Sequence, residues 1–207
     1  MANELIHASQ GTSLTQAEFE AVGLHVCNSQ ATGDLIYASS ATQLSRLAIG
    51  TTDYLLSIAG GVPVWVPRDI GAKVYHSVDQ SIPNDTYTNL AFNTEDYDTD
   101  VIHDTVTNNS RLTCKTAGKY SVTGRVSWAS DATGIRWCTL LKNGSQVSRG
   151  NWFSAVGAST TVLIFADIMS LAVNDYIEIQ VYQNRGSALD VLGGSIDKTN
   201  FAMQRIG

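Results

Sequence analysis

The segment that decides the fold reads Gly118-Lys119-Tyr120-Ser121-Val122-Thr123-Gly124-Arg125-Val126-Ser127-Trp128. Apolar and polar residues alternate along it, and one set of alternate positions holds its large apolar side chains: Tyr120, Val122, Val126 and Trp128. Successive side chains of a β-strand point to opposite faces of the sheet, so a period of two indicates a strand that is buried on one face. We therefore predict a strand over this segment, with Trp128 in the core.

Four later segments extend the pattern toward the C-terminus: 135–141, 162–165, 177–181 and 201–206. In the first of them, the alternation predicts that Ile135, Trp137 and Leu141 face the core. Residues 162–165 are apolar at every position, so we expect that strand to be buried on both faces. Each of the four segments is therefore predicted to be a strand.

Turn signals separate these strands. The strongest is Lys142-Asn143-Gly144-Ser145, because an Asn-Gly pair tolerates the positive φ angles of a type I′ hairpin turn. No helical period occurs after residue 72. Short strands separated by turns in this way are typical of an all-β, antiparallel jelly-roll sandwich.

Residues 1–72 are mostly irregular in pattern. A capping box at residues 15–18 predicts one short helix, which would end near Val22. The apolar pieces that follow are residues 35–37, 44–49, 54–58 and 62–66. Strands this short cannot bury their own faces, so we expect this region to intertwine with other copies of the chain. Residues 67–71 form the junction, which predicts domains 1–72 and 73–207.

The composition limits the partners. Only 15% of the residues are charged, 43% are hydrophobic, and the net charge is −6. Phosphate-binding surfaces need clustered Lys and Arg, so we expect neither nucleic acid nor an anionic membrane as a partner. No apolar run approaches the ~20 residues of a membrane helix. Residues 1–5 also lack the features of a signal peptide, so we expect a protein made in a cytoplasm and not secreted by that route.

The spacing of the cysteines predicts neither a disulfide framework nor a metal site. The three cysteines are Cys27, Cys114 and Cys138. Their number is odd and no Cys-x-x-Cys pair occurs, so the sequence encodes neither a disulfide framework nor a zinc site. We expect reduced, partly buried thiols.

Four motifs follow one another in the second region: Phe92-Asn93-Thr94-Glu95-Asp96-Tyr97-Asp98, Ala117-Gly118-Lys119-Tyr120-Ser121-Val122, Leu141-Lys142-Asn143-Gly144 and Leu171-Ala172-Val173-Asn174-Asp175-Tyr176-Ile177. In this order they resemble the globular head of complement's first component and the tumour-necrosis-factor-like jelly rolls. The resemblance covers roughly residues 72–207 and extends to the final aromatic strand at Phe201.

This chain departs from that family at two motif positions. Asn174 stands where the family usually has Gly, and Ser121 stands where it often has an aromatic residue. Collagen-like Gly-x-y repeats are absent, so the resemblance does not imply complement activity. It implies a ten-stranded jelly roll that assembles as a threefold trimer.

A second set of motifs lies in residues 25–66: Gly33-Asp34-Leu35-Ile36-Tyr37, Leu44-Ser45-Arg46-Leu47-Ala48-Ile49-Gly50, Tyr54-Leu55-Leu56-Ser57-Ile58 and Gly61-Val62-Pro63-Val64-Trp65. These resemble a segment of bacteriophage tail-fibre and virion-appendage proteins. The resemblance implies a place in the virion, and it applies equally to a tail or a head appendage.

Catalytic patterns are missing from the sequence. The histidines, at positions 7, 25, 76 and 103, fall in no metal-ligand spacing such as His-Glu-x-x-His. A Gly-x-Ser-x-Gly nucleophile elbow and a phosphate-binding loop are also absent. We therefore predict that the chain is not an enzyme and needs no cofactor.

Two groups of residues are candidates for ligand contact. Asp96, Asp98 and Asp100 alternate in an acidic stretch that could offer oxygen ligands to calcium, although the order of an EF-hand is absent. Trp152 is expected near a loop, where its ring could stack on a sugar, since aromatic faces suit the apolar side of a carbohydrate. Its neighbour Asn151 and the loop residues Asn184 and Arg185 complete this candidate set.

The function hypothesis is a homotrimeric tail-fibre or spike subunit of a bacteriophage virion. Residues 1–72 would attach to other virion proteins, and residues 73–207 would bind a host-surface glycan or protein. Two alternatives stay open. One is a head fibre or decoration trimer of the capsid, and the other is a cellular jelly-roll lectin.

Overall fold

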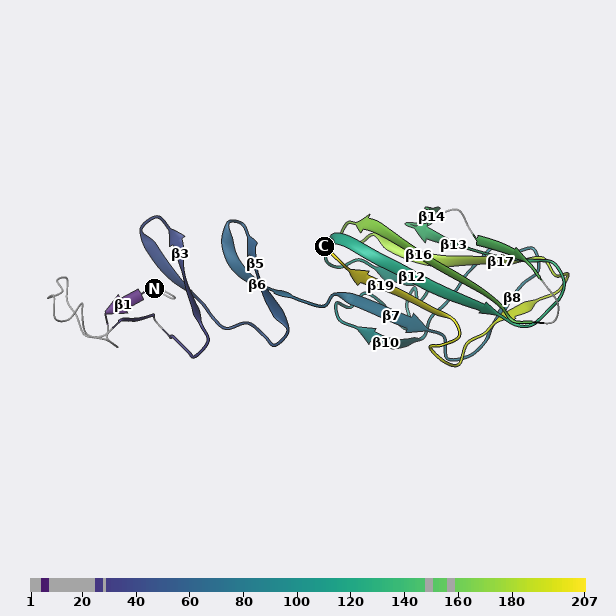
Figure 1. Ribbon diagram of the computed structural model, residues 1–207, viewed down its shortest axis with the longest axis horizontal. Helices are drawn as coiled ribbons and strands as arrows, with labels where there is room; N and C mark the ends of the chain where they lie inside the picture. The colour runs from purple at the N-terminus through teal and green to yellow at the C-terminus, as the bar shows by residue number, and fades with distance from the viewer. Residues whose placement is uncertain (1–4, 8–24, 28, 148–150, 156–158) are drawn as a thin grey trace. The chain divides into compact units, whose positions relative to one another are not determined.

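The computed structural model of the chain describes residues 5–7, 25–27, 29–147, 151–155 and 159–207 (Figure 1). All of the secondary-structure elements within these ranges are β-strands, so the predicted all-β class is confirmed. The short helix predicted over residues 15–22 lies outside the described residues. Within the described ranges, the chain has no helix of the length and apolarity needed to cross a membrane.

Two compact units make up the chain, residues 1–68 and residues 69–207. The boundary expected from the sequence, between Ala72 and Lys73, falls inside strand β7 (Gly71–Tyr75). This strand belongs to the second unit because it pairs antiparallel with two other strands of that unit, β10 (Thr94–Asp98) and β19 (Asn200–Arg205).

Three antiparallel strand pairs form the described part of the first unit. They are β1 (Leu5–His7) with β2 (His25–Cys27), β3 (Leu35–Ser40) with β4 (Gln43–Leu47), and β5 (Tyr54–Ala59) with β6 (Val62–Pro67). Each described pair is a two-stranded sheet of its own. An isolated two-stranded hairpin is marginally stable at best in water, so these pairs depend on further packing.

The motifs of the first unit meet at one carboxylate. Asp34 accepts hydrogen bonds from the backbone N–H of Ala31 at 2.6 Å and of Ile49 at 2.9 Å, and from the guanidinium of Arg46. The backbone hydrogen bond from Ala31 is the largest of the interactions that lower the pKa of Asp34. The Gly-Asp and Leu-x-Arg motifs therefore fix the β3–β4 hairpin and the segment that follows it.

The second unit is a sandwich of a seven-stranded and a six-stranded sheet. The first sheet, called here the β12 sheet, has the order β10-β7-β19-β12-β18-β8, and β16 pairs with the other edge of β12. The second, the β13 sheet, has the order β11-β17-β13-β14, with β15 also on β13 and β9 on β17. The strands not yet bounded are β8 (Gln80–Ile82), β9 (Thr88–Asn89), β11 (Arg111–Thr113), β12 (Gly118–Trp128), β13 (Ile135–Lys142), β14 (Ser145–Gln146), β15 (Asn151–Ser154), β16 (Thr161–Leu171), β17 (Tyr176–Gln183) and β18 (Leu189–Val191). This count exceeds the expected ten because several of the strands have only two or three residues.

The core lies between these sheets and is built around β12. Its Tyr120 and Trp128 are fully buried, as the alternation predicts. Phe92 and Phe201, from the first and last matched segments, contact each other with ring centroids 5.7 Å apart. Three of the four motifs of the jelly-roll resemblance contribute side chains to this core, among them Phe92, Tyr120 and Ile177, and the predicted sandwich is confirmed.

Two of the expected orientations were wrong. In β13 the core face holds Arg136, Cys138 and Leu140, so Trp137 lies on the outer face. The alternation gave the wrong inward face because arginine at position 136 was taken as exposed, since a buried arginine is rare unless it is paired. Arg136 is fully buried here because its guanidinium donates to the carbonyl oxygen of Thr133 at 2.8 Å, and lies 3.4 Å from the carboxylate of Asp131.

The second correction concerns β16, which was expected to be buried on both faces. Leu163 is in the core, but Val162 and Ile164 are exposed, because no described part of the chain covers the outer face of this strand. The apolar residues on that face therefore remain in contact with water in a single chain.

A polar cluster joins the two turns that carry the later motifs. Asp175 accepts hydrogen bonds from the Lys142 ammonium and the Asn143 side-chain amide, both at 2.8 Å, and from the backbone N–H of Ala172 at 2.9 Å. The Asn143 side chain in turn accepts from the backbone N–H of Tyr176 at 2.9 Å. This cluster holds the β13–β14 hairpin against the start of β17.

The family difference at Asn174 has a backbone explanation. Asn174 has a φ of 72°, in the left-handed region where Gly is the usual residue and Asn is the most tolerated alternative. The same holds in the predicted hairpin turn, where Asn143 and Gly144 have φ angles of 50° and 77°. Asn174 therefore adopts a backbone conformation that Gly would also accept, at the position where the resemblance predicts Gly.

We predict that Asp175→Asn removes a pH-dependent part of the stability of the second unit. The hydrogen bond from Lys142 is the largest cause that lowers the pKa of Asp175, to about 2. A lowered carboxyl pKa stabilises the fold fully above the unfolded-state value of 3.8, and this stabilisation is lost as the pH falls toward 2. Urea unfolding at pH 7 should show the variant less stable by about 1 kcal/mol.

The difference between wild type and variant should shrink between pH 4 and pH 2. Asp96→Asn is the control, because its carboxylate is exposed and lies 3.6 Å from the Lys73 ammonium. A difference that stays constant over this pH range would contradict the role given to the Asp175 charge.

A second prediction concerns Asn174. Replacement by Gly should leave the unfolding free energy within about 0.5 kcal/mol, whereas Asn174→Val should lower it by about 1–2 kcal/mol, because a β-branched residue is strained at this φ. Thermal and urea unfolding check both variants. Val173→Ala, in the same exposed turn, controls for the loss of turn packing.

Candidate functional site

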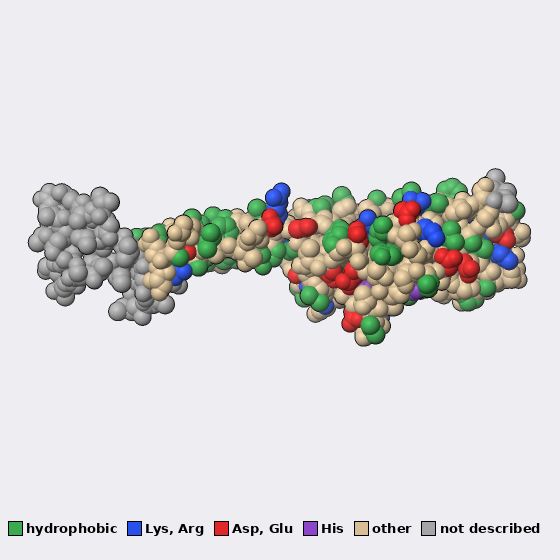
Figure 2. All heavy atoms as spheres, turned by 90° about the horizontal axis from the view of Figure 1, so that it is seen from below, with side chains coloured by type: hydrophobic (Ala, Val, Ile, Leu, Met, Phe, Trp, Pro, Cys, Tyr) green, Lys and Arg blue, Asp and Glu red, His purple; other side chains and the backbone are tan. Residues whose placement is uncertain are grey.

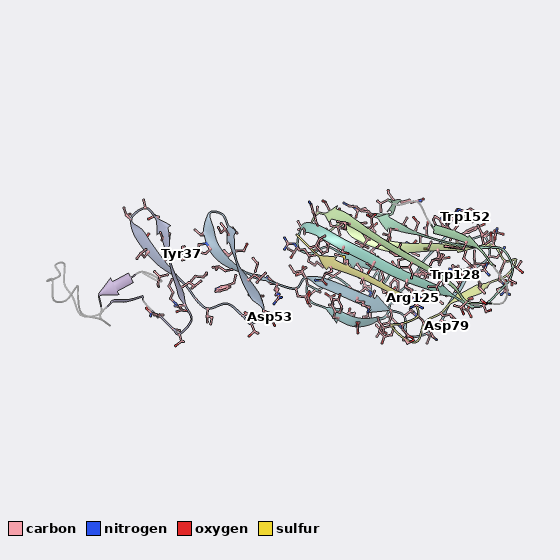
Figure 3. The ribbon with its side chains drawn as sticks, in the orientation of Figure 1. Tyr37, Asp53, Asp79, Arg125, Trp128 and Trp152 are labelled. Atoms are coloured by element: carbon pink, nitrogen blue, oxygen red, sulfur yellow. The ribbon has the colours of Figure 1, made fainter. Side chains whose placement is uncertain are left out.

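Three aromatic side chains form one cross-strand row on the outer face of the β13 sheet. Trp137 of β13 is paired with Tyr182 of β17 on one side and with Trp152 of β15 on the other. Neighbouring strands are about 4.8 Å apart, so the row spans about 10 Å. Trp152 is 62% exposed, which leaves its ring available at the edge of the row (Figure 3).

Tyr87, which precedes β9, completes the group. Its ring lies edge-on to Trp137 with centroids 5.3 Å apart, and 4.9 Å from the ring of Tyr182. Tyr87 is itself strongly exposed. We call Tyr87, Tyr182, Trp137 and Trp152 the aromatic row.

Polar groups border the aromatic row. The Tyr182 hydroxyl donates to Asp85 Oδ1 at 2.7 Å, and this hydrogen bond raises the pKa of Tyr182. The Asn84 side-chain amide donates to the other carboxylate oxygen of Asp85 at 2.6 Å. Further along the sheet, the Gln180 side-chain amide donates to Asn89 Oδ1 at 3.0 Å. The rim is thus made of amides, a hydroxyl and one carboxylate.

The structure brings together only part of the ligand-binding set predicted from the sequence. Trp152 is in the aromatic row, and Asn184 lies beside it, since its Oδ1 accepts the backbone N–H of Ile135 at 2.7 Å. Arg185 is held by Asp131, 3.0 Å from its guanidinium. The backbone of Asn151 pairs with Cys138 of β13, and its side chain lies outside what the structure describes.

Sequence reasoning placed Tyr182 in a candidate ligand-contact loop, residues 182–186, but missed Trp137 and Tyr87. Trp137 was assigned to the core because the alternation in β13 was placed on the wrong face. Tyr87 and Tyr182 carry no motif, and they meet Trp137 only through the pairing of β9 with β17 and of β17 with β13. Aromatic residues beside predicted turns are the sequence signal that marks them as candidates. That signal does not show which segments are neighbours in the sheet.

Two of the three acidic candidates for calcium, Asp96 and Asp98, are already engaged, whereas Asp100 Oδ2 is buried without a hydrogen-bond partner. Both oxygens of Asp98 accept backbone N–H groups, from Asp100, Ile102 and His103, at 2.8–3.1 Å. Asp96 forms an ion pair with Lys73. Among the residues that the structure describes, no cluster of three or more His, Cys, Asp or Glu is placed to hold a metal ion. The calcium hypothesis stays a prediction from sequence.

The buried His103 and the two buried cysteines lie in structural surroundings. The imidazole of His103 lies between Glu95 Oε1 at 3.0 Å and the carbonyl oxygen of Asn109 at 3.2 Å. Cys114 and Cys138 are free, buried thiols, and burial raises the pKa of Cys138 to about 12. A thiol with so high a pKa is a poor nucleophile at neutral pH.

Charge on the surface is sparse. On the face that Figure 2 shows, Lys and Arg side chains are scattered among acidic and uncharged side chains. That face offers no clustered basic surface of the kind that binds phosphate backbones.

Comparison with known proteins finds similarity in structure alone. No family model matches the chain, and no curated protein matches it. Murine APRIL at pH 5.0 aligns with a TM-score of 0.53 at 12% identity, over 67% of this chain and 99% of that chain. Murine APRIL at pH 8.0 gives 0.52 with the same identity and coverage. The globular domain of zebrafish complement 1qA protein gives 0.45 at 16% identity, over 65% of this chain and 93% of that one.

At such low identity the likeness to murine APRIL shows the fold and nothing further. It agrees with the jelly roll implied by the sequence resemblance. The chain therefore carries a jelly-roll sandwich of the fold found in murine APRIL.

Proposed function

We propose that this chain is a homotrimeric structural subunit of a bacteriophage virion, of the tail-fibre or spike type, that attaches the particle to a host surface. The first unit would hold the trimer to other virion proteins. The second unit would be the distal head and would present the aromatic row to a host glycan. The phage assignment rests on the motif resemblance in residues 25–66.

The observation that carries the trimer is the apolar outer face of β16. Ile164 and Ile168 are 67% and 64% exposed, and Val162 and Ala166 on the same face are also exposed. Monomeric proteins rarely leave a contiguous apolar patch of this kind in water. A neighbouring copy that covers it would gain about 25 cal/mol for each Å² of apolar surface removed. The tumour-necrosis-factor-like fold supports a threefold arrangement of these copies.

Attachment through the aromatic row follows from its chemistry. The flat faces of Trp152 and Tyr87 suit the apolar face of a sugar ring, and the neighbouring amides and hydroxyl suit its hydroxyl groups. A single site of this size binds weakly. Three copies on one trimer would act together, so weak contacts with a dense surface glycan become effective by avidity.

The first prediction of this proposal concerns assembly. Light scattering should give the full chain a mass of about three times 22.3 kDa. Ile164→Lys and Ile168→Lys should each shift the protein toward monomer, because a charge would then be buried in the subunit contact. Val106→Lys is the matched control, since Val106 is a strongly exposed loop valine away from β16. A monomeric full chain would refute the homotrimer.

The second prediction concerns binding. Trp152→Ala and Tyr87→Ala should each weaken binding of the trimer to its best ligand on an array of bacterial surface glycans at least tenfold, because each loss acts at three sites. Tyr97→Ala is the control, since Tyr97 is a partly exposed tyrosine on the other sheet. All three variants should remain trimeric. Equal binding by Trp152→Ala and the control would remove the aromatic row from the attachment role.

A further inference from the structure

A cavity of about 540 Å³ lies in the second unit, between the β10 edge of one sheet and the β11 edge of the other. Glu95 of β10 and Arg111 and Thr113 of β11 line it, together with much of the segment that joins these strands. Its volume lies in the range of about 300–1,000 Å³ that is typical of sites for small organic molecules. We call it the β10–β11 cavity.

Hydrogen bonds hold the joining segment in one shape. Asp98 Oδ2 accepts the backbone N–H of His103 at 2.8 Å. Asp104 Oδ1 accepts the backbone N–H groups of Val106 at 2.9 Å and of Thr107 at 2.8 Å. A site that is formed before its ligand arrives loses less conformational entropy on binding. The walls of the cavity are therefore already in place in the free chain.

Backbone strain is present in the same segment. Val101 and Asn108, which both line the cavity, have φ angles of 52° and 51°. Asparagine tolerates this region, but a β-branched residue is a true outlier there. Val101 is also 77% exposed, so burial of its side chain does not offset the strain. Strained backbone of this kind is concentrated at ligand sites.

The carboxylates at the cavity keep acceptor atoms for a ligand. Glu95 Oε1 lies 3.0 Å from His103 Nδ1, and Asp104 Oδ1 accepts the two N–H groups named above. The second oxygen of each carboxylate accepts no hydrogen bond from the described residues. Hydroxyl groups can donate to such oxygens, whereas a phosphate group would be repelled by both charges.

The cations at the cavity keep donor atoms. The Arg111 guanidinium lies over the ring of Tyr176, 4.0 Å from its centroid, which fixes its plane. Its Nε is buried without a hydrogen bond and lies 3.5 Å from Glu178 Oε1, an oxygen that accepts the Ser110 hydroxyl at 2.6 Å. Lys115 is exposed and makes no hydrogen bond or ion pair with the described residues. The guanidinium fork of Arg111 matches a carboxylate in shape and charge.

We propose that the β10–β11 cavity binds a sugar that carries one carboxylate, as a uronic acid unit of a polysaccharide does. Arg111 and Lys115 hold the sugar carboxylate. The second oxygens of Glu95 and Asp104 accept hydrogen bonds from the sugar hydroxyls. A ligand with one negative charge and several hydroxyl groups satisfies the cations and the carboxylates together, which neither a neutral sugar nor a phosphate does.

This site is separate from the aromatic row. Arg111 contacts Tyr176, which lies six residues before Tyr182 on β17, a distance of roughly 20 Å along the strand. All of the cavity residues belong to one chain. The proposal therefore depends neither on the homotrimer nor on binding through the aromatic row.

Titration calorimetry of the full chain with matched oligosaccharides tests the ligand class. Oligosaccharides of galacturonic acid and of glucuronic acid are the acidic probes, and oligosaccharides of galactose and of glucose are their neutral counterparts. At least one acidic probe should bind about tenfold or more tightly than its counterpart, and added salt should weaken that binding. The proposal is overturned if neither acidic probe binds at about 10 mM. Inorganic phosphate that binds as tightly as the acidic sugar would also overturn it, since the site would then hold a bare anion.

Variants test the position of the site. Lys115→Glu and Arg111→Gln should each weaken binding of the acidic probe by about tenfold or more. Lys119→Glu is the matched control, because it makes the same charge change at an exposed lysine of β12 outside the cavity. Thermal unfolding checks that Arg111→Gln is folded, and the exposed Lys115 decides the test if it is not. An equal loss in Lys119→Glu would overturn the site, because the effect would then be one of overall charge.

Trp152→Ala separates the cavity from the aromatic row. Its affinity for the acidic probe should equal that of the wild type. A loss of binding in Trp152→Ala, with Lys115→Glu unchanged, would place the acidic sugar on the aromatic row and overturn the cavity as its site.

Discussion

Burial of the Tyr120–Trp128 face of β12 is the interaction on which the rest of the sandwich depends. β12 pairs along its whole length with β16 and, on its other edge, with β19 and β18. Its inward residues contact a core that draws on both sheets, including Phe92 and Phe201. Side chains from an early loop and from the last strand of the second unit thus pack against one central strand. That arrangement leaves the outer faces of the two sheets free to carry different chemistry.

Those outer faces differ in kind. The outer face of the β13 sheet carries aromatic rings bordered by amides, and the outer face of β16 carries aliphatic side chains, among them Ile164 and Ile168. Aliphatic surface gains most when water is removed completely, as in a subunit contact, whereas an aromatic ring beside hydrogen-bonding groups can bind a ligand that stays partly hydrated. This contrast is the physical reason for assigning assembly to one sheet and attachment to the other.

The alternation of residues predicted much of the fold but less of the site. The strand at residues 118–128 was predicted because Tyr120 and Trp128 alternate with small polar residues, and the Asn143-Gly144 turn because few other pairs accept its backbone angles. The face of β13 was predicted wrongly because local patterns treat arginine as exposed, whereas Arg136 finds its partners at the end of the sandwich. The aromatic row depends on which strands are neighbours, and no local pattern contains that information.

The first unit extends the same reasoning to assembly. Its motif residues make contacts that shape hairpins, such as the carboxylate of Asp34 with Arg46 and the close approach of Gly50 to Trp65. These contacts leave Leu55, Leu56 and Ile58 of the β5–β6 hairpin exposed. A chain that specifies its hairpins so closely, yet leaves them too small to be stable alone, links folding of this region to association. In free subunits the β3–β4 and β5–β6 hairpins would then be weakly structured, whereas the second unit, with its own core, would be stable before assembly.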